Sequence, residues 1–259
     1  MTSTADRARN VETALRLVDE AADRGAALVG LPENFSFMGR DEDRIAGAET
    51  LEGPTVSALR ELAQRRKVFV LAGSIPEKVE HPGKTANTSV LIADDGSIAA
   101  SYRKIHLFDV AIPDGARYAE SETVVAGGEA VVAATPLGRI GLSVCYDLRF
   151  PELYRRLSDS GAEVLTVPAA FTLFTGKDHW EVLLRARAIE NLSYVLAPAQ
   201  VGRHSATRVT YGNSMIIDPW GVVLARCPDG EGVCVAPVSR TRLEQVRREL
   251  PALSHRRIR

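Results

Sequence analysis

Apolar positions along the chain alternate between helical and strand-like patterns. From about Thr4 to Arg24 they recur at spacings of three and four, which is typical of an amphipathic helix, and Gly25 follows as a common residue after a helix end. Residues 26–31 then form a continuous apolar run, which indicates a strand covered on both faces. This alternation predicts an α/β fold of layered sheets and helices.

The same criteria predict the remaining elements. Further helices are expected at 55–66, 151–158 and 181–190, and a capping box of Thr241 and Glu244 opens a last helix. Strands are expected at 68–72, 88–93, 98–102, 138–144, 163–167, 194–197, 213–217, 222–225 and 233–236, with a hairpin turn at 94–96. Residues 108–136 have little periodicity and are expected to wrap the surface. Since no repeat, linker or composition shift divides the chain, we expect residues 1–259 to form a single domain.

The predicted order of elements begins with a helix, whereas sheets of α/β proteins usually open with a strand. We therefore hypothesise that Met1 is an internal methionine of a longer reading frame, and that the fold as given lacks its first strand. Upstream reading-frame sequence with a strand-like apolar run would support this hypothesis.

Composition and charge narrow the class of protein. The 259 residues are 45% apolar and 25% charged, and the formal net charge of −1 gives no basic excess for nucleic acid or an anionic membrane. No apolar run approaches the roughly 20 residues of a membrane span, and the first ten residues lack the apolar segment of a secretory signal. Three cysteines make no disulfide framework, so we expect a reducing, cytoplasmic location.

Three residues at the ends of predicted strands are candidates for chemistry. Cys145 ends the apolar strand before Pro151, where a helix start can lower the pKa of a thiol below its free value of about 8.5. Glu33 ends a buried strand, where burial raises the pKa of a carboxyl group toward that of a general base. Lys104 follows the hairpin and could stabilise a thiolate and an oxyanion. Taken singly, each has a plainer interpretation as an inert cysteine, a solvent-facing acid or a surface lysine.

The segments that carry these residues resemble the three signature segments of the nitrilase superfamily, the carbon–nitrogen hydrolases. They are residues 31–33 (LPE), 102–106 (YRKIH) and 145–152 (CYDLRFPE), which keep the order and spacing of the family along essentially the whole chain. The resemblance implies an α-β-β-α sandwich that forms a homodimer or a higher homo-oligomer. No cofactor or metal is expected, because no step of the implied reaction requires one.

The resemblance also implies roles for individual residues. Cys145 is the expected nucleophile, Glu33 the general base and Lys104 the oxyanion stabiliser, aided by the backbone N–H of Tyr146. The further active-site glutamate of the family falls on Glu120.

Within the superfamily, three segments resemble the deaminated glutathione amidases: residues 179–190, 200–204 and 211–215. The implied reaction is hydrolysis of deaminated glutathione to 2-oxoglutarate and cysteinylglycine. Arg149 could then bind the carboxylate of the 2-oxo acid, or instead pair with Glu152. The 200–204 segment argues against the related ω-amidases that act on 2-oxoglutaramate.

Other classes of protein are weighed against this interpretation. Residues 141–145 resemble the nucleophile elbow of a serine hydrolase, but Cys stands in place of its last Gly, which argues against that class. The five histidines lack the spacing of metal ligands, which argues against a metal site. A Cys–His enzyme could use Cys145 with His106 or His179. Other carbon–nitrogen hydrolases, such as an N-carbamoyl amino acid amidohydrolase or a nitrilase, share the three segments, and a catalytically silent dimeric binding protein would keep the fold. The silent protein is disfavoured because none of the three expected catalytic positions is substituted.

Overall fold

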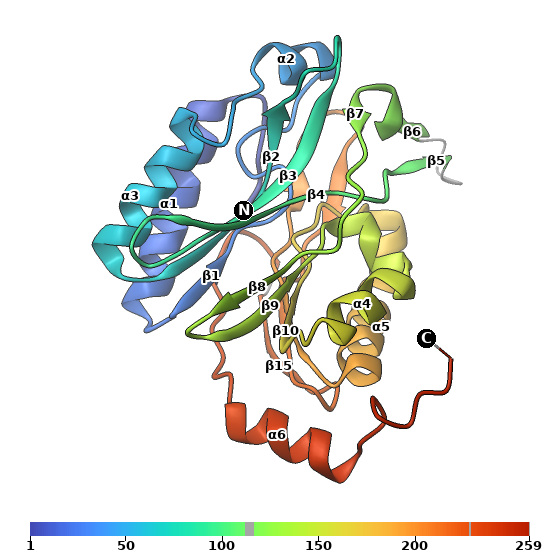
Figure 1. The fold of residues 1–259 in the computed structure, drawn as a ribbon. Helices are drawn as coiled ribbons and strands as arrows, with labels where there is room; N and C mark the ends of the chain where they lie inside the picture. The colour runs from blue at the N-terminus through green and yellow to red at the C-terminus, as the bar shows by residue number, and fades with distance from the viewer. Residues whose placement is uncertain (112–116, 228, 259) are drawn as a thin grey trace.

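The computed structural model describes residues 1–111, 117–227 and 229–258 (Figure 1). Its helices in chain order are α1 (Arg7–Asp23), α2 (Asp41–Ala46), α3 (Pro54–Arg66), α4 (Pro151–Asp159), α5 (Leu173–Asn191) and α6 (Arg240–Glu249). Short 3-10 turns, η1 (Glu120–Glu122) and η2 (Cys145–Arg149), interrupt the loops. None of the helices in these ranges is long and apolar enough to cross a bilayer.

Two sheets form the centre of the molecule. The first contains β1 (Leu28–Gly30), β2 (Phe69–Lys78), β3 (Thr85–Ile92) and β4 (Ile98–Arg103) in that order, with β7 (Val124–Val125) beside β3. The second runs in the order β15 (Val223–Arg226), β14 (Met215–Ile217), β11 (Tyr194–Ala197), β10 (Val164–Thr166), β9 (Gly138–Leu142) and β8 (Val132–Thr135). Two small ribbons pair β5 (Asp109–Ala111) with β6 (Arg117–Ala119) and β12 (Val201–Arg203) with β13 (Val209–Tyr211).

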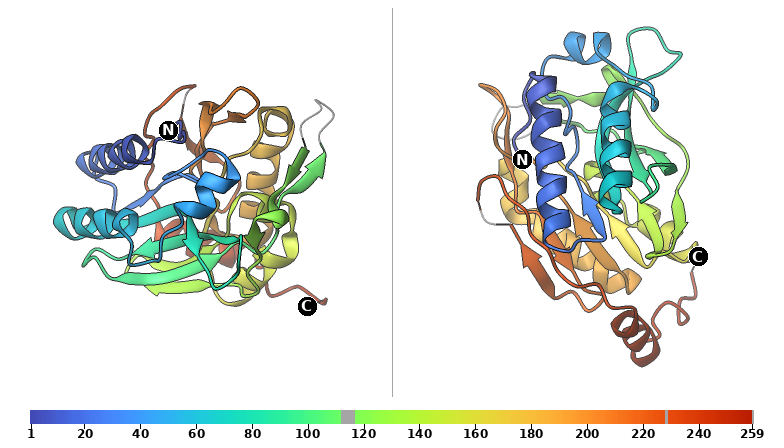
Figure 2. Two further views of the ribbon diagram at one scale, coloured as in Figure 1. Left: turned by 90° about the horizontal axis from the view of Figure 1, so that it is seen from above. Right: turned by 90° about the vertical axis from the view of Figure 1, so that its left-hand side faces the viewer.

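The sheets and helices stack in four layers, as Figure 2 shows from two sides. Helices α1 and α3 cover the outer face of the first sheet, and α4 and α5 cover that of the second. Alternation along β2 explains the packing: Val70 and Ala72 pack with the cluster of α1 and α3, whereas Phe69 and Leu71 pack with the core that includes the second sheet. The α-β-β-α sandwich expected from the sequence is therefore confirmed.

Most predicted elements are found within a few residues of their expected bounds, and the differences have local causes. Helix α5 starts at Leu173, eight residues before 181, because the Thr172 hydroxyl caps it by accepting the Thr175 N–H. Helix α6 is capped by Ser239 rather than Thr241. Residues 233–236, expected to be a strand, form none, since no neighbouring strand pairs with them. The surface stretch 108–136 contains β5 to β8, and its residues 112–116 lie outside the described part of the chain.

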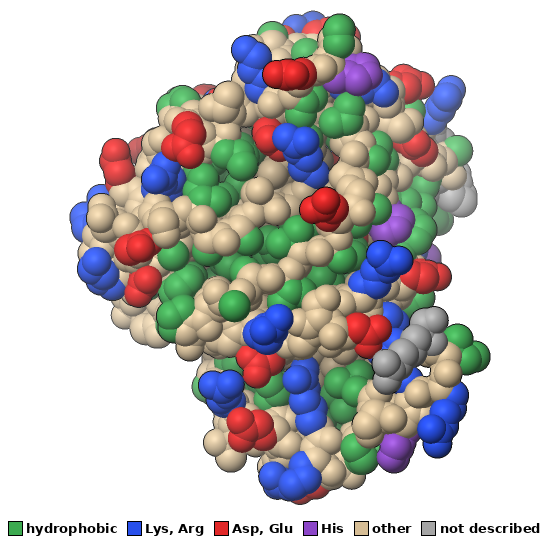
Figure 3. Space-filling model, viewed as in Figure 1, with side chains coloured by type: hydrophobic (Ala, Val, Ile, Leu, Met, Phe, Trp, Pro, Cys, Tyr) green, Lys and Arg blue, Asp and Glu red, His purple; other side chains and the backbone are tan. Residues whose placement is uncertain are grey.

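Charged side chains of both signs are interspersed over the face of the molecule that Figure 3 shows. This distribution agrees with the near-zero net charge of the chain. No broad basic field for a nucleic-acid backbone covers this face.

Candidate active site

Glu33, Lys104 and Cys145 meet where the two sheets face each other. Glu33 follows β1, Lys104 follows β4, and Cys145 follows β9 of the second sheet. The position of Glu33 depends on Gly73 in β2, because a Cβ there would lie 1.9 Å from the backbone oxygen of Pro32. The glycine and the register shift between Ala72 and Ile75 let β2 pass against the strand end that carries the glutamate.

Lys104 is held between two carboxylates in the interior. Its side chain is 2% exposed, and Nζ donates hydrogen bonds to Glu33 Oε1 at 2.9 Å and to Glu120 Oε2 at 2.8 Å. Burial alone would lower the pKa of Lys104, but the charges of Glu120 and Glu33 outweigh burial and raise it. The ammonium has three N–H donors, so one remains to point at a ligand.

Glu33 is fixed by donors from three other segments. Its Oε1 also accepts from Asn87 Nδ2 at 3.0 Å, and its Oε2 accepts from the backbone N–H of Ala170 at 2.9 Å. Ala170 follows β10, so this contact joins the two sheets across the site. Glu33 is 3% exposed. This burial contradicts the alternative interpretation of Glu33 as an acid that faces solvent.

Glu120 lies on the other side of Lys104. Its Oε2 accepts from the N–H of Phe108 at 2.7 Å and its Oε1 from Asn87 Nδ2 at 3.0 Å. Burial alone would raise the pKa of Glu120, but the charge and hydrogen bond of Lys104 lower it. Asn87 therefore bridges both glutamates, a contact that the sequence analysis missed. The only sequence signal for Asn87 is an amide side chain in a strand whose residues are all buried.

Cys145 occupies a strained position next to this cluster. Its φ of 49° lies in the left-handed region, which is unfavourable for a residue with a Cβ, and its N–H donates to the oxygen of Pro168 at 2.9 Å. Burial and the charge of Glu33, to which the thiol is hydrogen-bonded, raise the pKa of Cys145, and Lys104 opposes them. The sequence analysis expected a lowered pKa. That expectation was wrong, because the thiol is buried and faces the Glu33 carboxylate as well as the ammonium of Lys104.

Asp147 connects the segment that carries Cys145 to the segment that carries Lys104. Its fully buried carboxylate accepts from the N–H of Val144 at 2.8 Å and from the hydroxyl of Tyr102 at 2.7 Å. His106 joins the same carboxylate through its backbone N–H and its ring Nδ1. The His106 ring also stacks on Phe150 with centroids 3.7 Å apart. These contacts engage His106 with Asp147 and Phe150, and His106 does not line the pocket that contains Cys145, which argues against its use as a catalytic base.

A pocket of about 190 Å³ opens in front of the cluster. Its wall contains Glu33, Lys104, Glu120, Cys145 and Tyr146, the five residues of the predicted chemistry. In the described part of the chain, the Tyr146 N–H has no hydrogen-bond acceptor, so this donor is available beside the sulfur.

Four arginines line the same pocket, of which Arg44 pairs with Asp41 and Arg117 with Glu122, whereas Arg149 and Arg208 have no described ion pair. The Arg149 guanidinium lies over the rings of Tyr146 and Phe171, at 5.8 Å and 5.3 Å from their centroids, and its Nη1 is 3.3 Å from His179 Nδ1. Among the described contacts of Arg149 there is no ion pair with Glu152, the alternative considered from the sequence. Arg208, from the loop between β12 and β13, also lines the pocket, although the sequence offered no reason to select it.

The remaining titratable residues suggest no second site of this kind. Within the described ranges, no three His, Cys, Asp or Glu side chains are grouped to hold a metal ion. Cys227 and Cys234 lie away from the pocket and contact each other, and the hydrogen bond from Cys234 lowers the pKa of Cys227.

Comparisons with known proteins agree with this geometry. The carbon–nitrogen hydrolase family profile matches residues 1–248. A protein of Synechocystis sp. named deaminated glutathione amidase is 51% identical over 99% of this chain and 95% of its own length. A human protein of the same name is 46% identical over 99% of this chain and 80% of its own length.

The fold also resembles solved structures. The crystal structure of the NitFhit protein of Caenorhabditis elegans superposes with a TM-score of 0.91 at 41% identity, over 99% of this chain and 63% of that chain. The agreement in fold and in sequence extends over nearly all of the chain.

Proposed function

Because the chain belongs to the carbon–nitrogen hydrolase family, we propose that the Cys145 pocket hydrolyses the amide bond of deaminated glutathione to give 2-oxoglutarate and cysteinylglycine. The observation that carries the proposal is the contact of Lys104 with both Glu33 and Glu120 beside the Cys145 thiol. This arrangement gives one pocket a nucleophile, a base and an oxyanion donor. The names of the relatives support the choice of amide.

Acylation begins from a protonated thiol, since the pKa of Cys145 is raised. Glu33 removes the proton as the sulfur attacks the amide carbonyl carbon. The free N–H of Lys104 and the backbone N–H of Tyr146 bind the resulting oxyanion. The C–N bond then breaks, Glu33 gives its proton to the leaving amine, and the acyl group stays on sulfur as a thioester.

Deacylation uses the same groups with water as the nucleophile. Glu33 takes a proton from water, and the hydroxide attacks the thioester carbonyl while Lys104 and Tyr146 again bind the oxyanion. When the C–S bond breaks, the carboxylic acid leaves and the proton on Glu33 returns to the sulfur. Glu120 acts as a positioning residue, because its Oε2 accepts from Nζ of Lys104 and its described contacts do not include Cys145.

Substrate recognition is assigned to the two of the four pocket arginines that have no described ion pair, Arg149 and Arg208. Deaminated glutathione has a carboxylate at its 2-oxo acid end and another at its glycine end, and Arg149 and Arg208 line the pocket. We assign Arg149, four residues from the nucleophile, to the 2-oxo acid and Arg208 to the distant carboxylate. Two charge-assisted contacts of this kind favour a dicarboxylate over a neutral amide.

We expect Arg149→Ala to raise KM about 10–100-fold for both deaminated glutathione and 2-oxoglutaramate, because each loses a hydrogen bond between charged groups. Arg208→Ala should raise KM only for deaminated glutathione, since 2-oxoglutaramate has no second carboxylate. Steady-state kinetics measures both, with Arg156→Ala on the exposed side of α4 as a control that should change neither value. Equal effects of the two pocket variants on both substrates would contradict the assignment.

The decisive test of function is a kinetic comparison of four substrates. Deaminated glutathione, 2-oxoglutaramate, a simple nitrile and an N-carbamoyl amino acid are assayed side by side. We expect kcat/KM to be highest for deaminated glutathione by at least about tenfold. Comparable values for all four would contradict the specific substrate but not the broader amidase, and no turnover of any amide would contradict both.

We also propose a reducing, cytoplasmic location and a homodimer. All three cysteines are free, as the nucleophile requires. Apolar side chains on one face of α5 support self-association: Phe174, Val182 and Ile189 are 39%, 66% and 45% exposed and lie seven and eight residues apart.

A further inference from the structure

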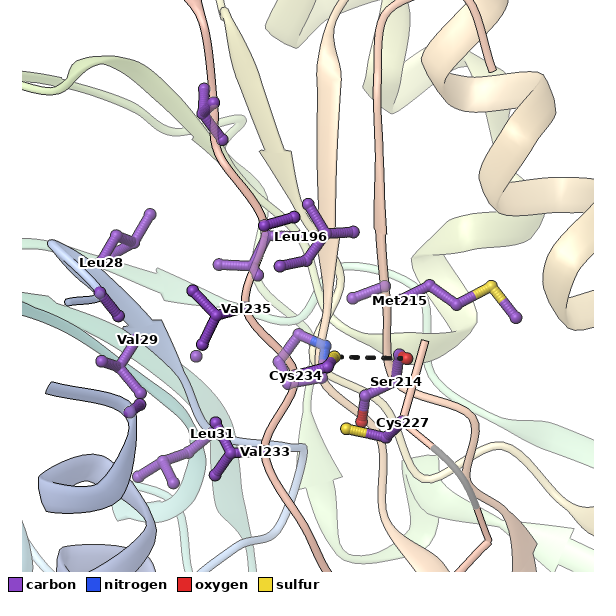
Figure 4. Close-up of a pocket in the computed structure, with 18 of the residues that line it drawn as sticks. Leu28, Val29, Leu31, Leu196, Ser214, Met215, Cys227, Val233, Cys234 and Val235 are labelled. Carbon is purple, nitrogen blue, oxygen red and sulfur yellow. Dashed lines mark hydrogen bonds between the residues drawn. The ribbon is translucent and has the colours of Figure 1, made fainter. Parts of the chain in front are cut away.

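The largest cavity of the described chain, about 540 Å³, is an apolar cleft beside β1. Figure 4 shows Leu28 and Leu31 on one side of this cleft and Val233 and Val235 on the other. None of the described residues that line the cleft has a charged side chain, whereas the wall of the Cys145 pocket contains a buried lysine between two glutamates. Groups that tune the proposed reaction therefore lie near that pocket rather than in the cleft.

Asn87 of β3 is buried directly behind the pocket. It is 2% exposed and is not among the residues that line the pocket. Along β3, Val90 and Ile92 pack with the cluster of α1 and α3, whereas Leu91 packs with the core that includes the second sheet. Because side chains alternate along a strand, Asn87 shares the inner face of β3 with Leu91. An amide between two sheets is unfavourable unless it forms hydrogen bonds, so its partners indicate its role.

Asn87 completes a closed ring of hydrogen bonds with the lysine and the two glutamates of the site. Its Nδ2 donates to Glu33 Oε1 and to Glu120 Oε1, each at 3.0 Å. Nζ of Lys104 donates to the same oxygen of Glu33 at 2.9 Å and to Glu120 Oε2 at 2.8 Å. The backbone oxygen of Asn87 also accepts the N–H of Lys104 at 2.9 Å. One residue thus holds the backbone of the lysine and both carboxylates that orient its ammonium.

This ring makes the two carboxylate oxygens of Glu33 unequal. From nitrogen donors, Oε1 accepts two hydrogen bonds, one from Asn87 and one from Lys104, whereas Oε2 accepts one, from the backbone N–H of Ala170 at 2.9 Å. A carboxylate oxygen has two lone pairs, so Oε1 is filled and Oε2 keeps one lone pair for a further donor. The thiol of Cys145 is hydrogen-bonded to Glu33. Oε2 is therefore the oxygen with room for the thiol proton.

The orientation of the Asn87 amide is set by the two glutamates alone. Its Oδ1 is buried and has no hydrogen-bond partner in the described part of the chain. Turning the amide over would place this oxygen against the two carboxylates and would leave both without a donor. A buried polar atom without a partner is uncommon in folded proteins and is found where another requirement outweighs stability. Here that requirement is the donation of one N–H to each glutamate.

We propose that Asn87 is a positioning residue of the reaction, which fills Oε1 of Glu33 and so leaves Oε2 as the oxygen that takes the proton from Cys145 and later from water. This inference rests on the proposed function, because it assigns an atom to the role of Glu33 in that reaction. In acylation the S–H bond breaks, the proton passes to Oε2, and the electron pair stays on the sulfur, which bonds to the carbonyl carbon. The second N–H of the amide holds Glu120 against Lys104, so the ammonium keeps its free donor for the oxyanion.

Asn87→Leu tests the proposal, because it removes both donors at a similar side-chain volume. We expect kcat to fall about 10–100-fold and KM to change less than about twofold, since Asn87 does not line the pocket. The acid limb of kcat against pH should move to higher pH by about one unit, because a carboxylate that loses a donor binds a proton more readily. If Oε1 were the accepting oxygen, freeing it would leave kcat unchanged or raise it, and that result would overturn the proposal.

Asn191→Leu is the matched control for lost stability. Asn191 of α5 is also fully buried, has an unpartnered Oδ1 and donates from Nδ2 to the backbone oxygen of Arg187 at 2.9 Å. This substitution should lower Tm but leave kcat and the acid limb unchanged. Equal shifts of the acid limb in the two Leu variants would assign the effect to stability and overturn the proposal. Asn87→Ser keeps one hydroxyl donor and should show a smaller shift in the same direction, which gives a second measurement if Asn87→Leu does not fold.

Alkylation of Cys145 by iodoacetamide tests the inference without any amide turnover. Burial and then the charge of Glu33 raise the pKa of Cys145. Without the donor from Asn87 that charge acts more strongly on the thiol, so the pH midpoint of alkylation should rise by about 0.5–1 unit in Asn87→Leu. An unchanged or lowered midpoint would overturn the role of Asn87. Absence of amide turnover in the unchanged protein would instead contradict the proposed function, and the two failures are thereby distinguished.

Discussion

Replacing Glu33 by Gln is expected to reduce kcat/KM for the amide substrate at least about 10³-fold while making the Cys145 thiol more reactive toward alkylation. The loss of activity follows from removal of the base that takes the thiol proton and later activates water, since general acid–base catalysis contributes about 10²–10⁴-fold. The gain in reactivity follows from the pKa of the thiol, which burial and then the charge and hydrogen bond of Glu33 raise while Lys104 lowers it. Gln removes the charge of Glu33 and leaves Lys104 in place.

Two measurements test this result on the same protein. Steady-state kinetics gives kcat/KM, and the pH dependence of the iodoacetamide reaction gives the apparent pKa of the thiol, which should be lower in Glu33→Gln than in the unchanged protein. Glu122→Gln is the control, because Glu122 is an exposed residue of η1 and should leave both quantities unchanged. If Cys145 worked with a histidine instead, Glu33→Gln would keep most of the amidase rate.

Replacing Lys104 by Met is expected to destabilise the fold as well as the transition state. Met has a similar length, but it leaves Glu33 and Glu120 as buried like charges with Asn87 between them. Removing one partner from a buried ionic cluster costs about 3–5 kcal/mol, which corresponds to a fall in Tm of about 10 °C in a protein of this size. Loss of an oxyanion donor should lower kcat by about 10²–10³-fold more.

The destabilisation should depend on pH in a direction set by Glu120. In the unchanged protein the pKa of Glu120 is lowered, so this group stabilises the fold above its ordinary value of about 4.3 and loses that contribution as pH falls through the lowered value. Without Lys104, burial and the charge of Glu33 raise the pKa of the same group, so the variant loses stability as pH rises above the ordinary value. The difference in Tm should therefore be larger at pH 8 than at pH 5.

Thermal unfolding at the two pH values measures this dependence. Lys84→Met is the control, because Lys84 is partly buried nearby but donates to the backbone oxygen of Ser121 rather than to a carboxylate. A pH-independent difference for Lys104→Met would mean that lost packing, and not repulsion between the glutamates, causes the destabilisation.

The sequence predicted those parts of the fold and site that depend on local patterns. Periodicity located α1, β1 and the hairpin of β3 and β4, because each buries a face that repeats with the geometry of its own element. The glutamate, lysine and cysteine were selected by strand ends and by three motifs, and the structure places them in one pocket.

The parts that were missed depend on contacts between distant segments. Asn87 bridges the two glutamates only because β3 passes behind Lys104, and Arg208 reaches the pocket from a loop whose sequence carries no signal. The raised pKa of Cys145 was missed for the same reason, since the direction depends on the burial of the sulfur and its distance from Glu33. Residues 233–236 have the composition of a strand, but a strand also requires a partner.

The hydrogen bond from Ala170 to Glu33 joins residues 137 positions apart and crosses from one sheet to the other. Contacts of such long sequence separation form late in folding, because closing large loops costs chain entropy before the contact is gained. A partly folded chain with only one sheet complete has either Glu33 or Cys145 in place but not both, and is therefore catalytically inert. Recovery of turnover during refolding thus reports the docking of the two halves, and a nascent chain acquires hydrolytic capacity only once its synthesis has passed the second sheet.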